Sequence, residues 1–195
     1  MRQANIETTA TPMNVQIRGG SIRSGMAGAV FDNDGGFLTV SNMQVSDITS
    51  PSFMATANGG VSFLQNSIVT SSTMDQVTFT TAQGAQSVLN TTVTQMITMR
   101  DTFFVEDSGS SLMVTGSLIS DNQIVSNTWA GYTVLRGATA TVTGSTLSGN
   151  SGLEFGAAAG GEGSSLTMTD SIISGNTGSV SFPFAHHVDK TRQHA

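Results

Sequence analysis

Apolar residues recur along this chain at nearly constant intervals. One column of them is spaced by 23, 23, 25, 26, 28 and 26 residues and consists of Ile17, Val40, Phe63, Val88, Val114, Val142 and Met168. A second, mostly apolar column stands two positions earlier, at Val15, Leu38, Val61, Gln86, Leu112, Ala140 and Leu166. Because side chains at i and i+2 lie on the same face of a strand, the two columns predict one half-buried strand in every repeat.

A third column predicts a second strand in each repeat. It lies five positions after the first column, at Ile22, Val45, Ile68, Val93, Ile119, Leu147 and Ile173. An odd step of five breaks strand alternation, so a turn must intervene. The position two residues after the first column holds Gly19, Asn42, Gln65, Asn90, Gly116, Gly144 and Asp170. Six of these seven are Gly, Asn or Asp, which best tolerate a left-handed backbone, so we expect a sharp bend there and an altered bend at Gln65. We also expect Asn side chains and backbone amides to bond from one stacked bend to the next.

A third strand is expected ahead of each glycine-rich segment. Its less regular pattern comprises Ala29 and Phe31, Phe53, Val77 and Phe79, Phe103 and Val105, Tyr132 and Val134, and Phe155. Three strands per repeat that stack in register make an all-β fold, a right-handed parallel β-helix (solenoid) of about seven rungs, because parallel crossovers are right-handed. We expect the β-helix to span residues 13–179, after an N-terminal extension over 1–12 and before a C-terminal cap or tail over 180–195.

Three stretches of sequence resemble a known superfamily. Residues 28–49, 137–152 and 163–178 are similar to rungs of the pectin-lyase-like parallel β-helices, above all to the repetitive adhesin and autotransporter-passenger branch. The shared pattern is G-x-L-T-V-T-x-S-x-I-S-G-N, and its clearest copies lie at residues 145–150 and 171–176. The resemblance implies the fold over residues 13–178. It implies no single activity, since the superfamily includes lyases, hydrolases, adhesins and tailspikes.

Charge and composition exclude several classes of partner. The net charge is −6, and the few basic residues form no stripe, which argues against nucleic acid and anionic membranes. No run of about 18 apolar residues is present, so no membrane span is expected. The first twelve residues lack the apolar stretch of a signal peptide, and the chain contains no Cys. We expect an extracellular or cell-surface location, with this chain excised from a longer one.

The sequence suggests no catalytic residues. The Asn-Thr-Asp, Asp-Asp, Gly-His-Gly and Arg-Ile-Lys signatures of polygalacturonase-like relatives are missing, and every His lies in the tail. The best carboxylate pairs, Asp32 with Asp34 and Glu106 with Asp107, stand at equivalent places three rungs apart. That separation of about 14 Å is too wide for an acid–base pair. Oxygen ligands at Asp32 and Asp34 suit calcium, although turn formation explains the same residues; no other metal or cofactor is expected.

The longest interval between rungs contains two candidate binding aromatics. Trp129 and Tyr132 lie in the 28-residue spacing between rungs five and six, where an inserted loop would let them stack on sugar rings or anchor a protein. The alternative is structural, with Tyr132 opening the third strand and Trp129 packing over the coil.

Polar residues dominate the outward positions of the first strand. These are predicted to be Thr39, Ser62, Ser87, Met113, Thr141 and Thr167, flanked by Ser41, Leu64, Leu89, Thr115, Thr143 and Thr169. Thr115, Thr143 and Thr169 would belong to a flat hydroxyl patch in rungs five to seven. We therefore expect a non-catalytic module for adhesion, carbohydrate or protein binding, or scaffolding. The alternatives are a polysaccharide lyase or glycoside hydrolase of the same fold and, third, an ice-binding solenoid, although such solenoids carry more uniform ranks. Uncovered solenoid ends would imply self-association or further rungs in a longer parent chain.

Overall fold

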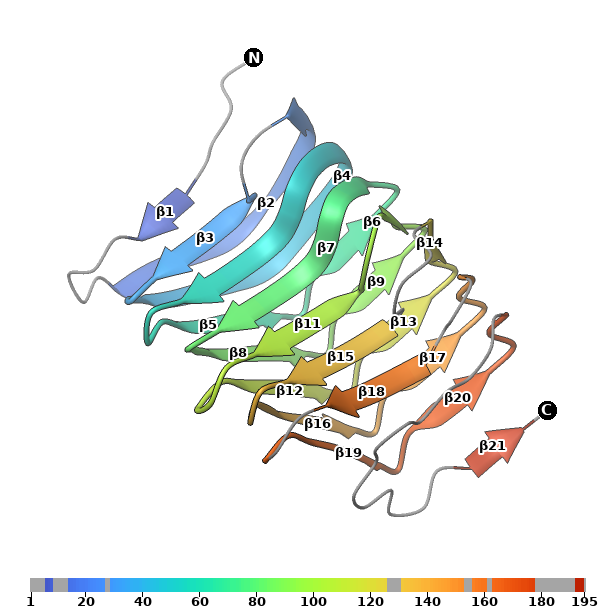
Figure 1. Ribbon diagram of the computed structural model, residues 1–195. Coiled ribbons are helices and arrows are strands. Elements are labelled where there is room, and N and C mark those ends of the chain that lie inside the picture. The colour runs from blue at the N-terminus through green and yellow to red at the C-terminus, as the bar shows by residue number, and fades with distance from the viewer. Residues whose placement is uncertain are drawn as a thin grey trace.

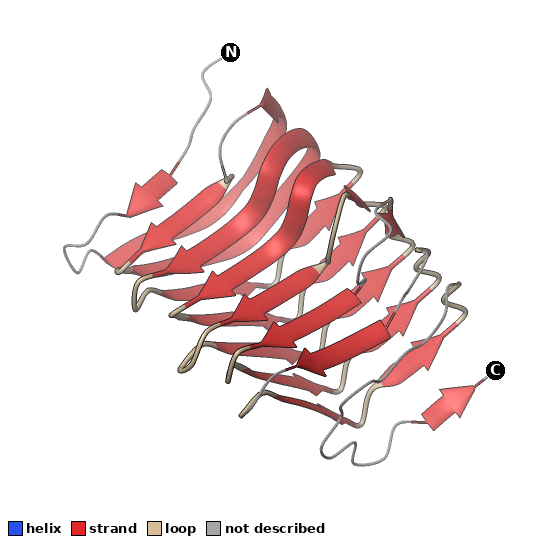
Figure 2. Ribbon diagram, viewed as in Figure 1, coloured by secondary structure: helices blue, strands red, loops and turns tan. Residues whose placement is uncertain are grey.

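The computed structural model is a parallel β-helix that winds around one core (Figure 1). It describes residues 6–8, 14–26, 29–125, 131–152, 156–160, 163–177 and 192–194. Every regular element in this described part is a strand, and every strand pairing in it is parallel (Figure 2). The prediction of a right-handed parallel β-helix is confirmed, with seven first strands that are joined by about six turns.

Three sheets run along the stack. The first sheet contains the N-terminal parts of β2 (Asn14–Met26) and β4 (Phe37–Ala57), followed by β5 (Val61–Gln65), β8 (Ala85–Leu89), β12 (Ser111–Thr115), β16 (Thr139–Thr143) and β19 (Ser165–Thr169). The second sheet contains the next part of β2 and β4, then β6 (Ile68–Thr70), β9 (Thr92–Thr94), β13 (Leu118–Ser120), β17 (Thr146–Ser148), β20 (Ile172–Ser174) and β21 (Arg192–His194).

The third sheet contains β1 (Ile6–Thr8), β3 (Phe31–Asp34), the C-terminal part of β4, β7 (Thr73–Ala82), β11 (Phe103–Glu106), β15 (Gly131–Leu135) and β18 (Gly156–Gly160). The short strands β10 (Ile97–Thr98) and β14 (Gln123–Ile124) lie between the second and third sheets. The less regular third strand expected from the sequence is thereby confirmed for these segments. Phe155, also expected there, lies outside the described residues.

The expected register is wrong by one residue in rung three. Val40 pairs with Leu64, and Leu64 pairs with Val88, so Leu64 rather than Phe63 occupies the buried column. In the second sheet, the buried column contains Val69 and not Ile68, which is 44% exposed. The register shift also moves the bend from Gln65 to Asn66, so the altered bend expected at Gln65 does not occur.

Left-handed backbone marks the first bend in every rung. The seven bend residues, Gly19, Asn42, Asn66, Asn90, Gly116, Gly144 and Asp170, have φ values from 47° to 66°. A second left-handed bend, which the sequence columns did not reveal, follows the second sheet at Asp47, Ser71, Gln95, Asp121, Gly149 and Gly175. Gly, Asn and Asp dominate both bends because they tolerate positive φ best.

Side chains just after each bend form ladders from rung to rung. After the first bend, backbone N–H groups of Met43, Thr91, Ser117 and Ser145 donate to the hydroxyls of Ser67, Ser117, Ser145 and Ser171 at 3.1–3.2 Å. The expected Asn bonding therefore gives way to Ser bonding here, because Asn42, Asn66 and Asn90 point to solvent. After the second bend, Asn122, Asn150 and Asn176 form the corresponding ladder.

The interior changes character along the stack. Aromatic rings from successive rungs pack at centroid distances of 5.4, 5.6 and 4.7 Å along Phe31, Phe53, Phe79 and Phe103. Beside them, buried polar side chains satisfy one another: Asn33 and Thr56 both donate to the Ser62 hydroxyl, and Thr81 donates to Gln86. From rung five onward, Val105, Leu112, Val134 and Ala140 occupy the positions of these polar groups.

Candidate binding face

The outer face of the first sheet is the candidate functional site, and three columns of side chains build it. In rungs six and seven, Thr139, Thr141 and Thr143 of β16 pair in register with Ser165, Thr167 and Thr169 of β19. In rung five, β12 continues the same columns with Ser111, Met113 and Thr115. Strand alternation points these residues outward, because Leu112, Val114, Ala140 and Val142 between them are buried.

The N-terminal half of this face is more apolar. Its outward columns are Phe37, Val61 and Ala85; Thr39, Phe63 and Ser87; and Ser41, Gln65 and Leu89. Phe37 is 52% exposed, whereas Ser41 is buried despite its place in the column. Two residues expected to point outward, Ser62 and Leu64, lie in the core as a consequence of the register shift. Phe63 and Gln65 take their places.

The face carries no formal charge between rungs two and seven. Its outward residues on β4, β5, β8, β12, β16 and β19 are Ser, Thr, Gln or apolar. The chain as a whole has a net charge of −6. Charged side chains therefore lie elsewhere, including Arg18 in rung one of the same sheet, and rungs two to seven present a neutral surface.

The residues predicted to bind do not all gather on this face. Thr115, Thr143 and Thr169 do, as consecutive members of one column. Tyr132 belongs to β15 of the third sheet, where it pairs with Phe103 and Ala157, so its backbone occupies the strand position of the structural alternative. Trp129 lies outside the described residues, as do the tail residues His186 and His187.

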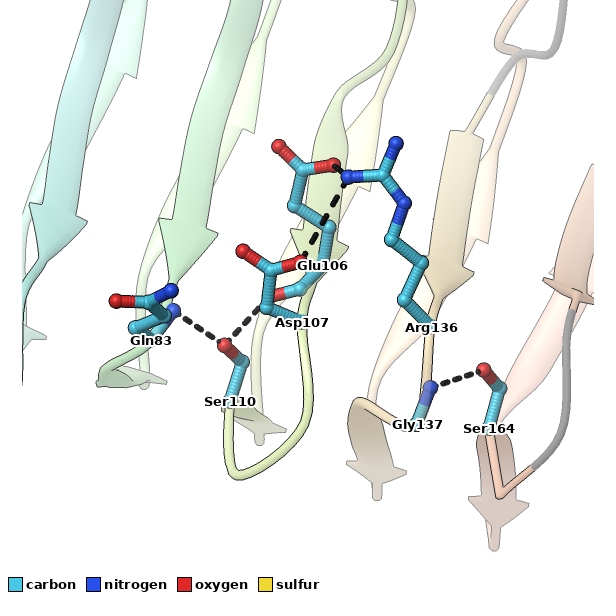
Figure 3. Close-up of polar contacts among 7 residues, drawn as sticks. All are labelled: Gln83, Glu106, Asp107, Ser110, Arg136, Gly137 and Ser164. Atoms are coloured by element: carbon cyan, nitrogen blue, oxygen red, sulfur yellow. Dashed lines mark hydrogen bonds and ion pairs between the residues drawn. The ribbon is translucent and has the colours of Figure 1, made fainter.

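The predicted carboxylates lie on the third sheet and its turns. Asp34 pairs with Ala57, then Ala82, then Glu106, so Asp34 and Glu106 stand three rungs apart as expected. The amide of Asn58 donates to Asp34, and the guanidinium of Arg136 lies 3.2 Å from Glu106 and 3.6 Å from Asp107 (Figure 3). The Arg136 side chain is 70% exposed, so this cluster is a solvated ion-pair group.

Strand alternation keeps Asp32 and Asp34, whose oxygens are expected to bind calcium, on one face of β3 and sets Asn33 on the other. Asn33 points into the core, where its Nδ2 donates to the carbonyl oxygens of Gly36 and Val61 and to the Ser62 hydroxyl. Asp32 and Asp34, on either side, belong to the opposite face of β3. Among the described residues, no group of three or more His, Asp or Glu side chains is placed to hold a metal ion.

Serine side chains order the turns that lead into the first sheet. The hydroxyl of Ser110 accepts from the backbone N–H of Gln83 at 2.6 Å and donates to the carbonyl of Glu106 at 2.5 Å. Two rungs further along, the N–H of Gly137 donates to the hydroxyl of Ser164 at 2.9 Å (Figure 3). These bonds fix the point at which β12 and β19 begin, and so help to hold the register of the candidate face.

Arg100 and Asp101 precede β11 and differ in exposure. Asp101 is only 2% exposed, whereas Arg100 is exposed. The Arg100 guanidinium lies 5.3 Å from the ring centroid of Phe104. That geometry is typical of a cation–π contact.

Hydrophobicity alone does not identify the aromatic and aliphatic members of the face. Phe37 and Phe63 are apolar but outward, and Val61 is only half-buried. The Asn at position 66 was the available signal, because the bend column elsewhere consists of Gly, Asn and Asp. Aligning on Asn66 would have placed Phe63 outside.

Comparison with protein-family models, with curated proteins and with solved structures finds no match to this chain. The part of the chain that the structure describes also contains no helix long and apolar enough to cross a membrane.

Proposed function

We propose that this protein is a non-catalytic adhesion or binding module of the pectin-lyase-like type, located outside the cell or on its surface. Its contact surface would be the outer face of the first sheet, and its partner a carbohydrate or protein surface. The observation that supports this most is the neutral character of that face across six rungs of an acidic chain.

A neutral, rigid face favours contact over a broad area. Burying unpaired charges would oppose association, whereas Ser and Thr hydroxyls can exchange water for partner hydrogen bonds at little net cost. The exposed Phe37 and Met113 add apolar area that gains from removal from water. The backbone is held on both sides by parallel pairing in β5, β8, β12 and β16, so little conformational entropy is lost on binding.

An enzymatic role receives less support. Asp34 and Glu106 are separated by three rungs, about 14 Å at the usual strand spacing. Glycosidase carboxylates stand about 5–9.5 Å apart. Glu106 also lies 3.2 Å from the guanidinium of Arg136, in a solvated ion pair.

The test compares binding by the wild type and by two charged double variants. Thr141→Lys with Thr167→Lys places two charges on adjacent rungs of the candidate face. Ala55→Lys with Thr80→Lys is the matched control on adjacent rungs of the third sheet. Binding to a glycan array and to immobilised cell-surface extract should be lost in the first variant and kept in the control.

Two outcomes would overturn the proposal. Equal binding by both double variants, with loss in Trp129→Ala, would place the contact at the loop between rungs five and six instead of the first sheet. Release of shortened or unsaturated products from any glycan of the panel would make the protein an enzyme.

A further inference from the structure

Hydroxyl groups occupy most outward positions in the C-terminal half of the candidate face, and Met113 in the middle of β12 interrupts them. We define the hydroxyl lattice as Ser111, Thr115, Thr139, Thr141, Thr143, Ser165, Thr167 and Thr169. Its rows follow from the register of β12, β16 and β19. Neighbouring rungs stand about 4.8 Å apart, and alternate residues of one strand stand about 6.8 Å apart. The backbone therefore fixes the spacing of the hydroxyl-bearing residues in two directions, along each strand and from rung to rung.

Single contacts with such hydroxyls are weak. A neutral hydrogen bond that replaces one to water contributes only about 0.5–1.5 kcal/mol. A flexible ligand would lose much of that gain to the ordering of its own chain. The lattice therefore favours a partner that is itself rigid and periodic, because many weak contacts then add without a further ordering cost.

The size and composition of the face narrow the choice of partner. Six rungs of five-residue strands cover on the order of 500 Å², whereas a stable protein interface buries about 800 Å² on each partner. Contact with a folded protein would therefore have to extend beyond this face. None of the eight lattice residues is aromatic, so the ring stacking that commonly holds sugars is absent from the lattice itself. The aromatic residues Phe37 and Phe63 lie at the other end of the face.

We infer that the hydroxyl lattice orders water and binds the surface of ice. Each Thr combines a hydroxyl that donates and accepts with a methyl group, and Thr139 and Thr141 are the most exposed examples. Because ice presents the same water donors and acceptors as the liquid, the hydroxyls would keep hydrogen-bond partners on binding. The absence of charge on the face matters equally, since a charged group would keep a liquid-like hydration shell. The inference rests on the proposed role of the first sheet as the contact surface.

The experiment uses ice alone as the probe. Ice is grown slowly on a cold finger from a dilute solution of the full chain, with serum albumin as the excluded reference protein. Thr141→Tyr with Thr167→Tyr disrupts the lattice on adjacent rungs. Thr70→Tyr with Thr94→Tyr is the matched control on adjacent rungs of the second sheet, where both side chains are half-buried. Circular dichroism at the same temperature verifies that each variant is folded.

The wild type and the control should be enriched in the ice fraction, and the lattice variant should lose that enrichment and be excluded like albumin. Exclusion of the wild type, or equal uptake of the lattice variant, would overturn the inference. Insoluble cellulose provides a second arm. Retention on cellulose that depends on Thr141 and Thr167, with exclusion from ice, would refute ice binding while the proposed contact surface stands. Loss of neither activity in the lattice variant would refute both.

Discussion

Asn122 and Asn150 occupy the same place in neighbouring rungs, and Nδ2 of Asn122 donates to Oδ1 of Asn150 over 2.9 Å. The same Oδ1 accepts the backbone N–H of Asn122 at 3.0 Å, while Nδ2 of Asn150 reaches the carbonyl of Ile119 at 3.0 Å. Both side chains are buried. The pair repeats one rung later between Asn150 and Asn176, so one side chain joins three rungs.

Replacing the central member of this ladder should destabilise the stack. Asn150→Ala leaves the buried N–H of Asn122 without its acceptor, and we expect the free energy of unfolding to fall by about 1–3 kcal/mol. Asn176→Ala, at a half-buried position, should cost less because water can reach the freed groups. Denaturant titration followed by circular dichroism measures both. Equal losses of unfolding free energy in the two variants would show that burial of the Asn ladder does not add to the stability of the stack.

The register of rung three predicts that truncating Leu64 lowers the free energy of unfolding much more than truncating its neighbour Phe63. Leu64 is fully buried, so Leu64→Ala should lower the free energy of unfolding by about 2–5 kcal/mol. Phe63 faces outward and is half-buried, so Phe63→Ala should cost about 1 kcal/mol or less. The same titration compares them. A larger loss for Phe63→Ala would restore the register first expected from the sequence.

Replacing Gly59 or Gly60, adjacent at the turn before β5, should lower stability by different amounts, and for different physical reasons. A Cβ at Gly60 would lie 2.8 Å from the carbonyl oxygen of Asn33 and 2.9 Å from that of Ala57. Both are backbone atoms, so Gly60→Ala should cost more than about 2 kcal/mol. Gly59 has open space but a φ of +81°, so Gly59→Ala should cost about 1 kcal/mol. Thermal unfolding of the two variants distinguishes them, and a more damaging Gly59→Ala would contradict the close approach at Gly60.

The ion pair between Arg136 and Glu106 should contribute little to stability. The Arg136 side chain is 70% exposed, and solvent screens such a pair, so a double-mutant cycle with Arg136→Ala and Glu106→Ala should give a coupling below about 1 kcal/mol. Added salt should change the stability of the wild type and of Arg136→Ala almost equally. A coupling of several kcal/mol would assign this cluster a structural role that its exposure argues against.

Most of the fold is predictable from the sequence, because bends and strands each require particular residue types at particular positions. Gly, Asn and Asp recur where φ is positive, and apolar residues alternate where strands face the core; both patterns are visible without coordinates. Rung three departed from this logic because its interior is polar. Ser62 lies inside, held by Asn33 and Thr56, whereas Phe63 lies outside. Hydrophobicity alone therefore selected the wrong alternation.

The candidate face was predicted in part for the same reason. Alternation correctly placed Thr115, Thr143 and Thr169 in one outward column, since rungs five to seven have apolar interiors. It could not reveal the second bend, because the residues there range from Ser71 and Gln95 to Gly149. The internal pairing of polar groups is a three-dimensional property, and a single sequence gives no direct sign of it.

An engineered disulfide tests the central structural claim, the in-register parallel stacking that creates the neutral face. The chain has no Cys, so two can be introduced without competition. Phe63 pairs with Ser87 across adjacent rungs, and paired Cα atoms about 4.8 Å apart lie within the range that a disulfide spans. Phe63→Cys with Ser87→Cys should oxidise rapidly and completely, whereas Phe63→Cys with Val88→Cys should remain reduced because Val88 points into the core. Faster crosslinking of the second pair would contradict the register, and with it the face on which the proposed function depends.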